Sequence, residues 1–186
     1  MKRLAVFFPG VGYTPDKPLL YHSRRIAESL GFDILTLMFS GFPKKIRGDE
    51  QKMRKSFDLA LSQAKDQLQA ADLKAYDELA FLGKSLGAVA AAALAAELRC
   101  AQLVLYTPLE PAFSFPLPET IVFTGSADPW VAPGRIPALC AKKGIPCTVV
   151  PDANHSLETG DPLCDLERLR EIMIQTEHFL KEGRNK

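Results

Sequence analysis

Residues 78–87 read ELAFLGKSLG, and this stretch decides how the rest of the chain is interpreted. Its first half, Glu78–Leu82, has the apolar composition of a buried strand. The alanine-rich segment Leu86–Leu98 that follows predicts a helix able to approach the strands closely. Ser85 therefore lies between two glycines in a turn from strand to helix.

The G-x-S-x-G pattern at this turn is typical of a nucleophile elbow, in which a strained serine projects above the carboxyl end of a strand. Gly83 and Gly87 fit that geometry, because a Cβ at either position would collide with the neighbouring chain. An ordinary glycine-rich turn with an N-cap serine is the structural alternative. A phosphate-binding P-loop would need a glycine at position 78, where the chain has Glu78 in an apolar strand, so we exclude it.

Short apolar runs alternate with helical segments along the whole chain, which predicts an α/β protein with about six mostly parallel strands and helices on both faces. The predicted strands are Leu4–Phe8, Asp33–Phe39, Glu78–Leu82, Gln102–Tyr106, Thr120–Thr124 and Cys147–Val150. The predicted helices are Lys17–Leu30, Glu50–Ala71, Leu86–Leu98, Arg135–Lys143 and a last helix that begins at Pro162 after an Asp161 N-cap. We expect residues 1–186 to form a single domain. Thr107–Pro118 is too short for a cap domain, and its four prolines argue against a helix.

Composition limits the classes of partner. The 186 residues are 47% hydrophobic and carry a net charge of +1, which offers no electrostatic reason to expect nucleic acid or a membrane surface as the partner. The four cysteines lack any C-x-x-C spacing, so we expect reduced thiols and neither a disulfide framework nor a metal site. No apolar run approaches the ~20 residues of a membrane span. We expect a cytoplasmic monomer that needs no cofactor.

A base and an acid for Ser85 follow later strands of the predicted sheet. His155 lies in the loop after the last strand, where an imidazole can reach the serine, and Asp128 follows the strand before it. This gives the chain order Ser, Asp, His. Glu110, after an earlier strand, is an alternative acid, whereas Asp152 lies too near His155 along the chain to face its ring from behind. The two other histidines, 22 and 178, fall inside predicted helices.

Two backbone N–H groups are needed to bind a developing oxyanion. We expect one from Leu86, the residue after the serine, and one from the glycine-rich loop after the first strand, with Val11 the best candidate and Gly12 possible. Aromatic side chains near these loops, Tyr13 and Trp130, are candidate substrate-binding residues.

With these motifs in hand, the chain resembles the α/β-hydrolase superfamily, in particular its small capless members of the dienelactone-hydrolase-like and short carboxylesterase type. The resemblance rests on the loop 9–12, the elbow 83–87, the acid loop 125–129 and His155. Two differences are evident: dienelactone hydrolases use cysteine where this chain has Ser85, and the frequent His-Gly pair of the oxyanion loop is Pro9-Gly10 here.

The resemblance implies a serine hydrolase that cleaves a carboxylic ester or thioester of a small or medium acyl substrate through an acyl-enzyme. Its partner would then be a small acyl molecule. The alternative is a non-catalytic interaction module that retains the hydrolase fold.

Overall fold

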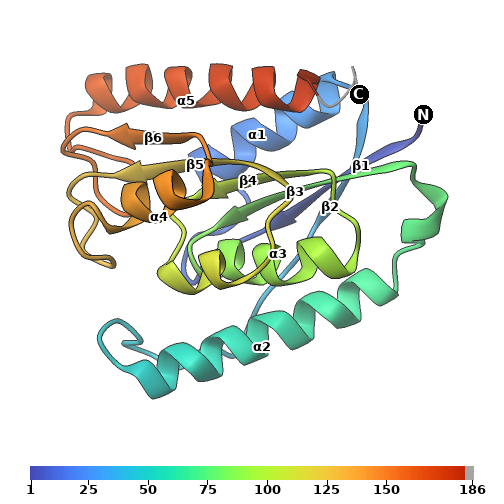
Figure 1. The fold of residues 1–186 in the computed structure, drawn as a ribbon, viewed down its shortest axis with the longest axis horizontal. Coiled ribbons are helices and arrows are strands. Elements are labelled where there is room, and N and C mark those ends of the chain that lie inside the picture. Colours follow the sequence, from blue (N-terminus) through green and yellow to red (C-terminus); the bar gives the residue numbers. More distant parts are fainter. Residues whose placement is uncertain (183–186) are drawn as a thin grey trace.

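Six parallel strands form one sheet in the order β2-β1-β3-β4-β5-β6 (Figure 1). The computed structural model describes residues 1–182. Each neighbouring pair of strands is parallel, so all six carboxyl ends lie at the same edge of the sheet. The strands are β1 (Arg3–Phe8), β2 (Phe32–Thr36), β3 (Glu78–Lys84), β4 (Gln102–Tyr106), β5 (Glu119–Gly125) and β6 (Cys147–Val150). The predicted α/β class is confirmed.

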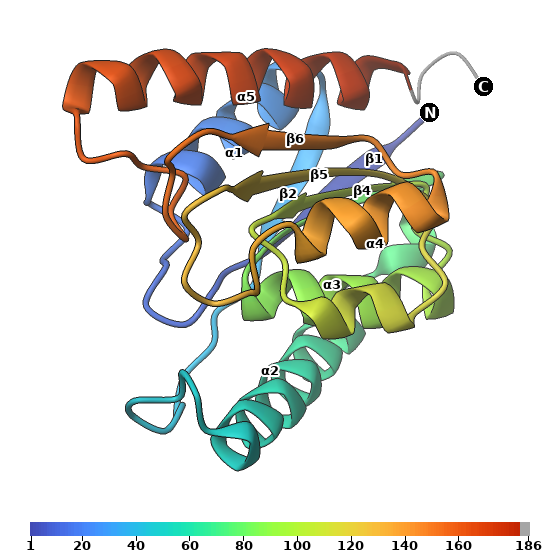
Figure 2. The same cartoon turned by 60° about the vertical axis from the view of Figure 1, so that its left-hand side comes forward.

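Helices cover both faces of this sheet, as predicted. Figure 1 shows α1 (Pro18–Ser29) and α5 (Pro162–Glu182) on one face, with α3 (Leu86–Glu97) and α4 (Arg135–Lys143) on the other. The long α2 (Glu50–Gln69) lies outside α3 and forms a further layer, which Figure 2 shows from a second direction. No helix within residues 1–182 is both long enough and apolar enough to cross a membrane.

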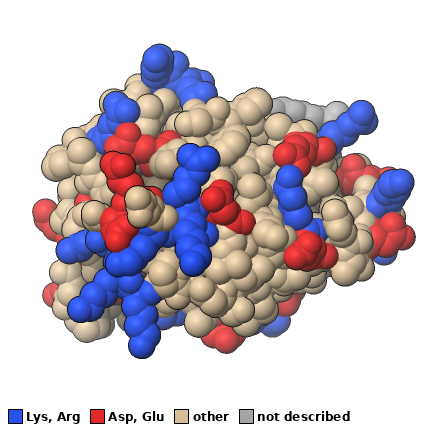
Figure 3. All heavy atoms as spheres, turned by 90° about the horizontal axis from the view of Figure 1, so that it is seen from below, with Lys and Arg blue, Asp and Glu red and all other residues tan. Residues whose placement is uncertain are grey.

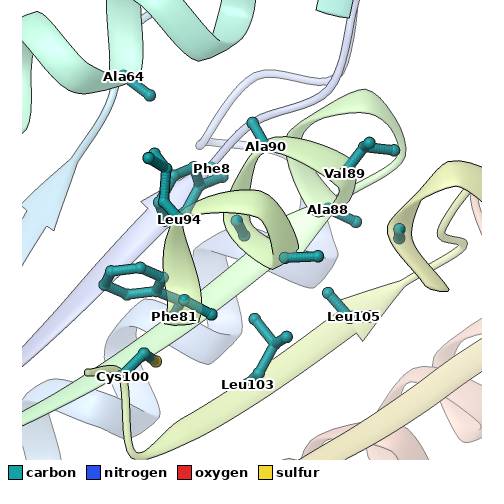
Figure 4. Packing of buried hydrophobic residues seen from close by; sticks show 14 of the residues in the cluster. Phe8, Ala64, Phe81, Ala88, Val89, Ala90, Leu94, Cys100, Leu103 and Leu105 are labelled. Carbon is teal, nitrogen blue, oxygen red and sulfur yellow. The ribbon is translucent and has the colours of Figure 1, made fainter. Parts of the chain in front are cut away.

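The core has one half on each side of the sheet, because successive side chains of a strand point to opposite faces. In β1, Leu4, Val6 and Phe8 pack toward α3, while Ala5 and Phe7 pack toward α1 and α5. Alanines of α3 let this helix lie close to the strands, and Figure 4 shows it enclosed by the sheet and Ala64 of α2. The helix α3 is therefore buried, as the composition of Leu86–Leu98 predicts, and it ends one residue earlier, at Glu97.

The second strand is shorter than predicted: it ends at Thr36, not at Phe39. The backbone of Met38 and of Ser40 is bonded instead by side-chain amides of α2, Gln67 and Gln63, in both donor and acceptor roles. These side-chain amides take the place of the hydrogen bonds that a neighbouring strand would provide, so the chain leaves the sheet at this point.

The proline-rich segment also differs from its prediction, because Glu110–Ser114 forms a short 3₁₀ helix. Pro111 is tolerated there because the first turn of a helix leaves its N–H groups unpaired in any case. The segment contains no cap domain, as expected.

Close backbone contacts join the first loop to the start of α3. A Cβ built on Gly87 would lie 2.2 Å from the Pro9 carbonyl oxygen, and one built on Gly10 would lie 3.2 Å from Cβ of Ser85. Glycine at both positions thus allows the loop after β1 to lie against the turn that carries the serine.

Candidate active site

Ser85 occupies a strained turn between β3 and α3. Its φ of 56° and ψ of −119° fall in a region that residues with a Cβ rarely adopt. Gly83 makes room for this turn, since a Cβ there would lie 2.6 Å from Cα of Ala88. The backbone conformation expected of a nucleophile elbow is therefore present.

The structure brings Ser85, His155 and Asp128 together in one chain of hydrogen bonds. Nδ1 of His155 lies 2.7 Å from Oδ2 of Asp128, and Nε2 lies 2.7 Å from Oγ of Ser85. A carboxylate only accepts hydrogen bonds, so the Nδ1–H donates to Asp128 and Nε2 is left to accept the Ser85 O–H. All three side chains are largely shielded from solvent, with Asp128 the most buried.

The loops that carry the acid and the base are bonded to each other. Ala127 N–H donates to the Ala153 carbonyl at 3.0 Å, and Ser126 N–H donates to the Val150 carbonyl at 3.0 Å. Gly125 permits this approach, because a Cβ there would lie 2.1 Å from the Ala153 oxygen. Asp128 and His155 are thus positioned by backbone contacts between the ends of β5 and β6.

Two neighbours of the histidine were not identified by sequence reasoning in these roles. The Thr107 hydroxyl, just after β4, donates to the His155 carbonyl at 3.0 Å and holds the loop in place. Trp130 stacks on the His155 ring, with centroids 5.0 Å apart, and its backbone N–H donates to Oδ1 of Asp128 at 2.9 Å. Trp130 had been singled out only as a substrate-binding candidate.

The alternative acids do not contact the histidine ring. Glu110 pairs with Arg135 at 2.7 Å on the surface, and Asp152 is exposed, with its N–H bonded to Oγ of Ser126. The other two histidines are exposed on α1 and α5. Of the carboxylates considered, Asp128 alone is hydrogen-bonded to His155 within residues 1–182.

The expected oxyanion donors lie on the two segments that meet at Ser85. Gly10 and Tyr13 close a turn through reciprocal 3.2 Å backbone hydrogen bonds, with Val11 and Gly12 at its tip. In the part of the chain that the structure describes, the N–H groups of Val11 and Leu86 donate no hydrogen bond within the protein. Both amides therefore remain candidates to bind an oxyanion.

Tyr13 is the other aromatic candidate for substrate binding, and its side chain packs into the core with that of Leu19. It is buried, and its hydroxyl accepts the Leu19 N–H at 3.1 Å. Its ring faces the ammonium group of Lys84, whose Nζ lies 4.9 Å from the ring centroid. Tyr13 therefore packs against that lysine.

Lys84 is a buried cation directly before the nucleophile candidate, and the sequence alone offered no signal of its burial. It is only 2% exposed, and burial lowers its pKa to about 7. The nearby Asp128 carboxylate opposes that shift in the Lys84 pKa.

The His155 pKa lies below its ordinary value, chiefly because the ring is buried. The hydrogen bond to Asp128 opposes this shift, whereas the charge of Lys84 adds to it. A base with a lowered pKa stays neutral, and so able to take a proton, in mildly acidic solution.

Structures of known proteins share this arrangement of strands and helices. An alpha-beta serine hydrolase homologue from Coxiella burnetii is 19% identical, with 95% of this chain and 84% of that chain covered and a TM-score of 0.69. A serine hydrolase without a lid from Xanthomonas campestris is 16% identical over 97% and 81% of the two chains, with a TM-score of 0.65.

The chain has the capless α/β-hydrolase fold. Est1E from Butyrivibrio proteoclasticus is a further structure with this fold, 13% identical over 100% of this chain and 89% of its own, with a TM-score of 0.68. No protein-family model matches the sequence, and no curated protein matches it. The α/β-hydrolase fold places the carboxyl ends of its strands, and the three hydrogen-bonded residues, at one edge of the sheet.

Proposed function

We propose that this protein is a serine hydrolase that cleaves carboxylic esters or thioesters of small or medium acyl substrates. The observation that carries the proposal is the hydrogen-bonded chain from Asp128 through His155 to Ser85, with the serine in a strained turn at the start of α3. Such a chain lets a weak nucleophile lose its proton as it attacks.

In the proposed first half-reaction, Nε2 of His155 takes the Ser85 proton while Oγ attacks the substrate carbonyl carbon. The carbonyl oxygen becomes an oxyanion that the N–H groups of Leu86 and Val11 bind. Asp128 stabilises the imidazolium through Nδ1. The intermediate collapses with cleavage of the C–O or C–S bond, and the leaving alcohol or thiol takes the proton from Nε2.

The second half-reaction reverses these roles. Water gives a proton to Nε2 of His155 and attacks the acyl carbon of the ester on Ser85. The same two amides bind the second oxyanion, and its collapse returns the proton to Oγ of Ser85 and releases the carboxylic acid. The reaction consumes one water molecule and needs no group beyond those of the chain.

The known structures that share this fold support a hydrolase activity for this chain, because several of them are named as hydrolases and one is named as an esterase. One structure of Est1E contains ferulic acid, an aromatic acid, bound to that protein. That a neighbour in fold binds a carboxylic acid supports an acyl substrate for this chain.

A fluorophosphonate probe, which reacts only with an activated serine, tests the proposal. We expect the wild-type protein to be labelled at Ser85, located by peptide mass spectrometry, and His155→Ala to lose the label. Ser62→Ala, at an exposed serine of α2, is the matched control and should label like wild type. A folded wild-type protein that takes no label and cleaves no ester would contradict the proposal and favour the interaction-module alternative.

A further inference from the structure

An apolar cavity of ≈640 Å³ lies between the start of α2, the start of α3 and the segment after β4. Pockets that hold small ligands span roughly 300–1,000 Å³ and have mostly apolar walls. The apolar residues of this wall are Met53, Phe57, Leu86, Val89, Leu109 and Pro111. The cavity is therefore large enough, and apolar enough, for part of a small organic substrate.

One wall of the cavity is formed by residues that follow Ser85 in the chain. Leu86 directly follows Ser85, and Val89 lies one turn further along the same helix. On the opposite side, Leu109 comes two residues after Thr107, whose hydroxyl is bonded to the His155 carbonyl. Leu86 and Leu109 thus connect the cavity along the chain to Ser85 and to the residue that holds the His155 loop.

Charged residues also line this cavity, because Asp49, Glu50 and Arg54 contribute to it beside the six apolar side chains. The segment 44–55 contains six lysines and arginines but two acidic residues, and all six cations are exposed. Figure 3 shows Lys and Arg gathered over this end of α2. Lys52 pairs with Asp49 at 2.9 Å, and Arg54 lies 4.0 Å from Asp58. Because Glu50 and Arg54 are exposed and Asp49 is paired with Lys52, these charges remain hydrated or paired, and the six apolar side chains favour an uncharged part of a ligand.

We infer that this cavity binds the acyl chain of the substrate, an uncharged aliphatic or aromatic group of medium length, and that Met53 and Phe57 limit its length. The inference rests on the proposed function for its meaning. Phe57 lies beside Phe115, with ring centroids 6.4 Å apart, so its ring is held in place behind the cavity wall. Burial of each methylene group in such a cavity favours binding by about fourfold.

The occupancy of the cavity can be measured without catalysis. The chain has four methionines, at positions 1, 38, 53 and 173, so ¹³C-methyl labelling yields few NMR signals. In Ser85→Ala, which cannot form an acyl-enzyme, we expect methyl octanoate to shift the Met53 signal in a saturable manner. The signals of Met173, a buried residue of α5, and of exposed Met38 should stay in place. Methyl acetate, too short to fill the cavity, should leave Met53 unchanged.

The effect on specificity is tested with Met53→Trp, which fills the cavity. We expect the ratio of kcat/KM for p-nitrophenyl octanoate to kcat/KM for p-nitrophenyl acetate to fall at least tenfold. Lys55→Trp places the same side chain on an exposed position of α2 and should leave both values unchanged.

The outcomes separate the two proposals. The acyl-cavity proposal is wrong if millimolar methyl octanoate leaves the Met53 chemical shift unchanged. It is also wrong if Met53→Trp and Lys55→Trp change kcat/KM for the two esters equally. A protein that hydrolyses neither ester contradicts the proposed function, and the Met53 titration then still decides whether the cavity binds an apolar chain.

Discussion

The indole ring of Trp130 lies against the imidazole of His155, with centroids 5.0 Å apart and ring planes inclined by 24°. The backbone N–H of the same tryptophan donates to Oδ1 of Asp128. One residue therefore shields the proposed base from water with its side chain and holds the proposed acid with its main chain. These two functions can be separated by substitution, because only the first depends on the side chain.

Trp130→Ala should raise the pKa of His155 toward its ordinary value, since burial is the main cause of the lowered pKa. We expect the acidic limb of the pH profile of kcat/KM to move to higher pH and kcat to fall. Trp130→Phe retains an aromatic face and should restore most of the wild-type profile. A profile that is the same in all three proteins would contradict a shielding role for the indole ring.

Asp128→Asn should lower kcat by about 10⁴-fold with the fold intact, because the amide no longer selects the tautomer with its proton on Nδ1. The measurement is a steady-state ester assay, with circular dichroism to check folding. Glu110→Gln removes only a surface partner of Arg135 and should stay within about twofold of wild type. The reverse result would identify Glu110 as the acid.

Lys84→Met should shift the acidic limb of kcat/KM to higher pH. The proposed mechanism needs neutral His155, and the positive charge of Lys84 lowers the His155 pKa, so removal of that charge raises it. Lys17→Met, at an exposed lysine whose Nζ lies 5.3 Å from the Tyr13 ring centroid, is the control and should leave the limb in place. Equal profiles for wild type and Lys84→Met would show that the lysine does not act on the base.

Lys84 also predicts how stability depends on pH. Its pKa is about 7 in the folded protein and near the ordinary 10.5 when unfolded, so the unfolded chain binds more protons between these values. The free energy of unfolding of wild type should therefore rise from pH 7 to pH 9 relative to that of Lys84→Met. Urea titrations at the two pH values measure this difference, and a constant difference would contradict the lowered pKa of Lys84.

Gly87→Ala should destabilise the protein by about 3 kcal/mol or more, because the added Cβ meets the carbonyl oxygens of Pro9 and Phe8 at 2.2 and 2.3 Å. Gly48→Ala meets no neighbour within 4 Å and carries only the cost of its positive φ, about 1–2 kcal/mol. Urea unfolding of both variants gives the comparison. Equal losses would mean that the first loop moves away easily from α3.

Much of this fold could be predicted from the sequence. Apolar runs such as Leu79–Leu82 and the alanines of α3 are local signals, and they placed the strands and the buried helix correctly. The extent of β2 was wrong, because glutamines of α2, far along the chain, take over the backbone of residues 38–40. Periodicity reports on neighbouring residues and contains no information about such a distant partner.

The sequence by itself determined the parallel α/β architecture, the strained turn at Ser85 and the order in which an acid and a base follow it. Only the tertiary structure decided that Asp128 and not Glu110 meets His155, that Trp130 covers the imidazole, that Tyr13 turns inward and that Lys84 is buried. The physical reason is distance along the chain. His155 lies 70 residues from Ser85 and 27 from Asp128, so their 2.7 Å contacts depend on the order of β3, β4, β5 and β6 in the sheet and on the loops that leave its carboxyl edge.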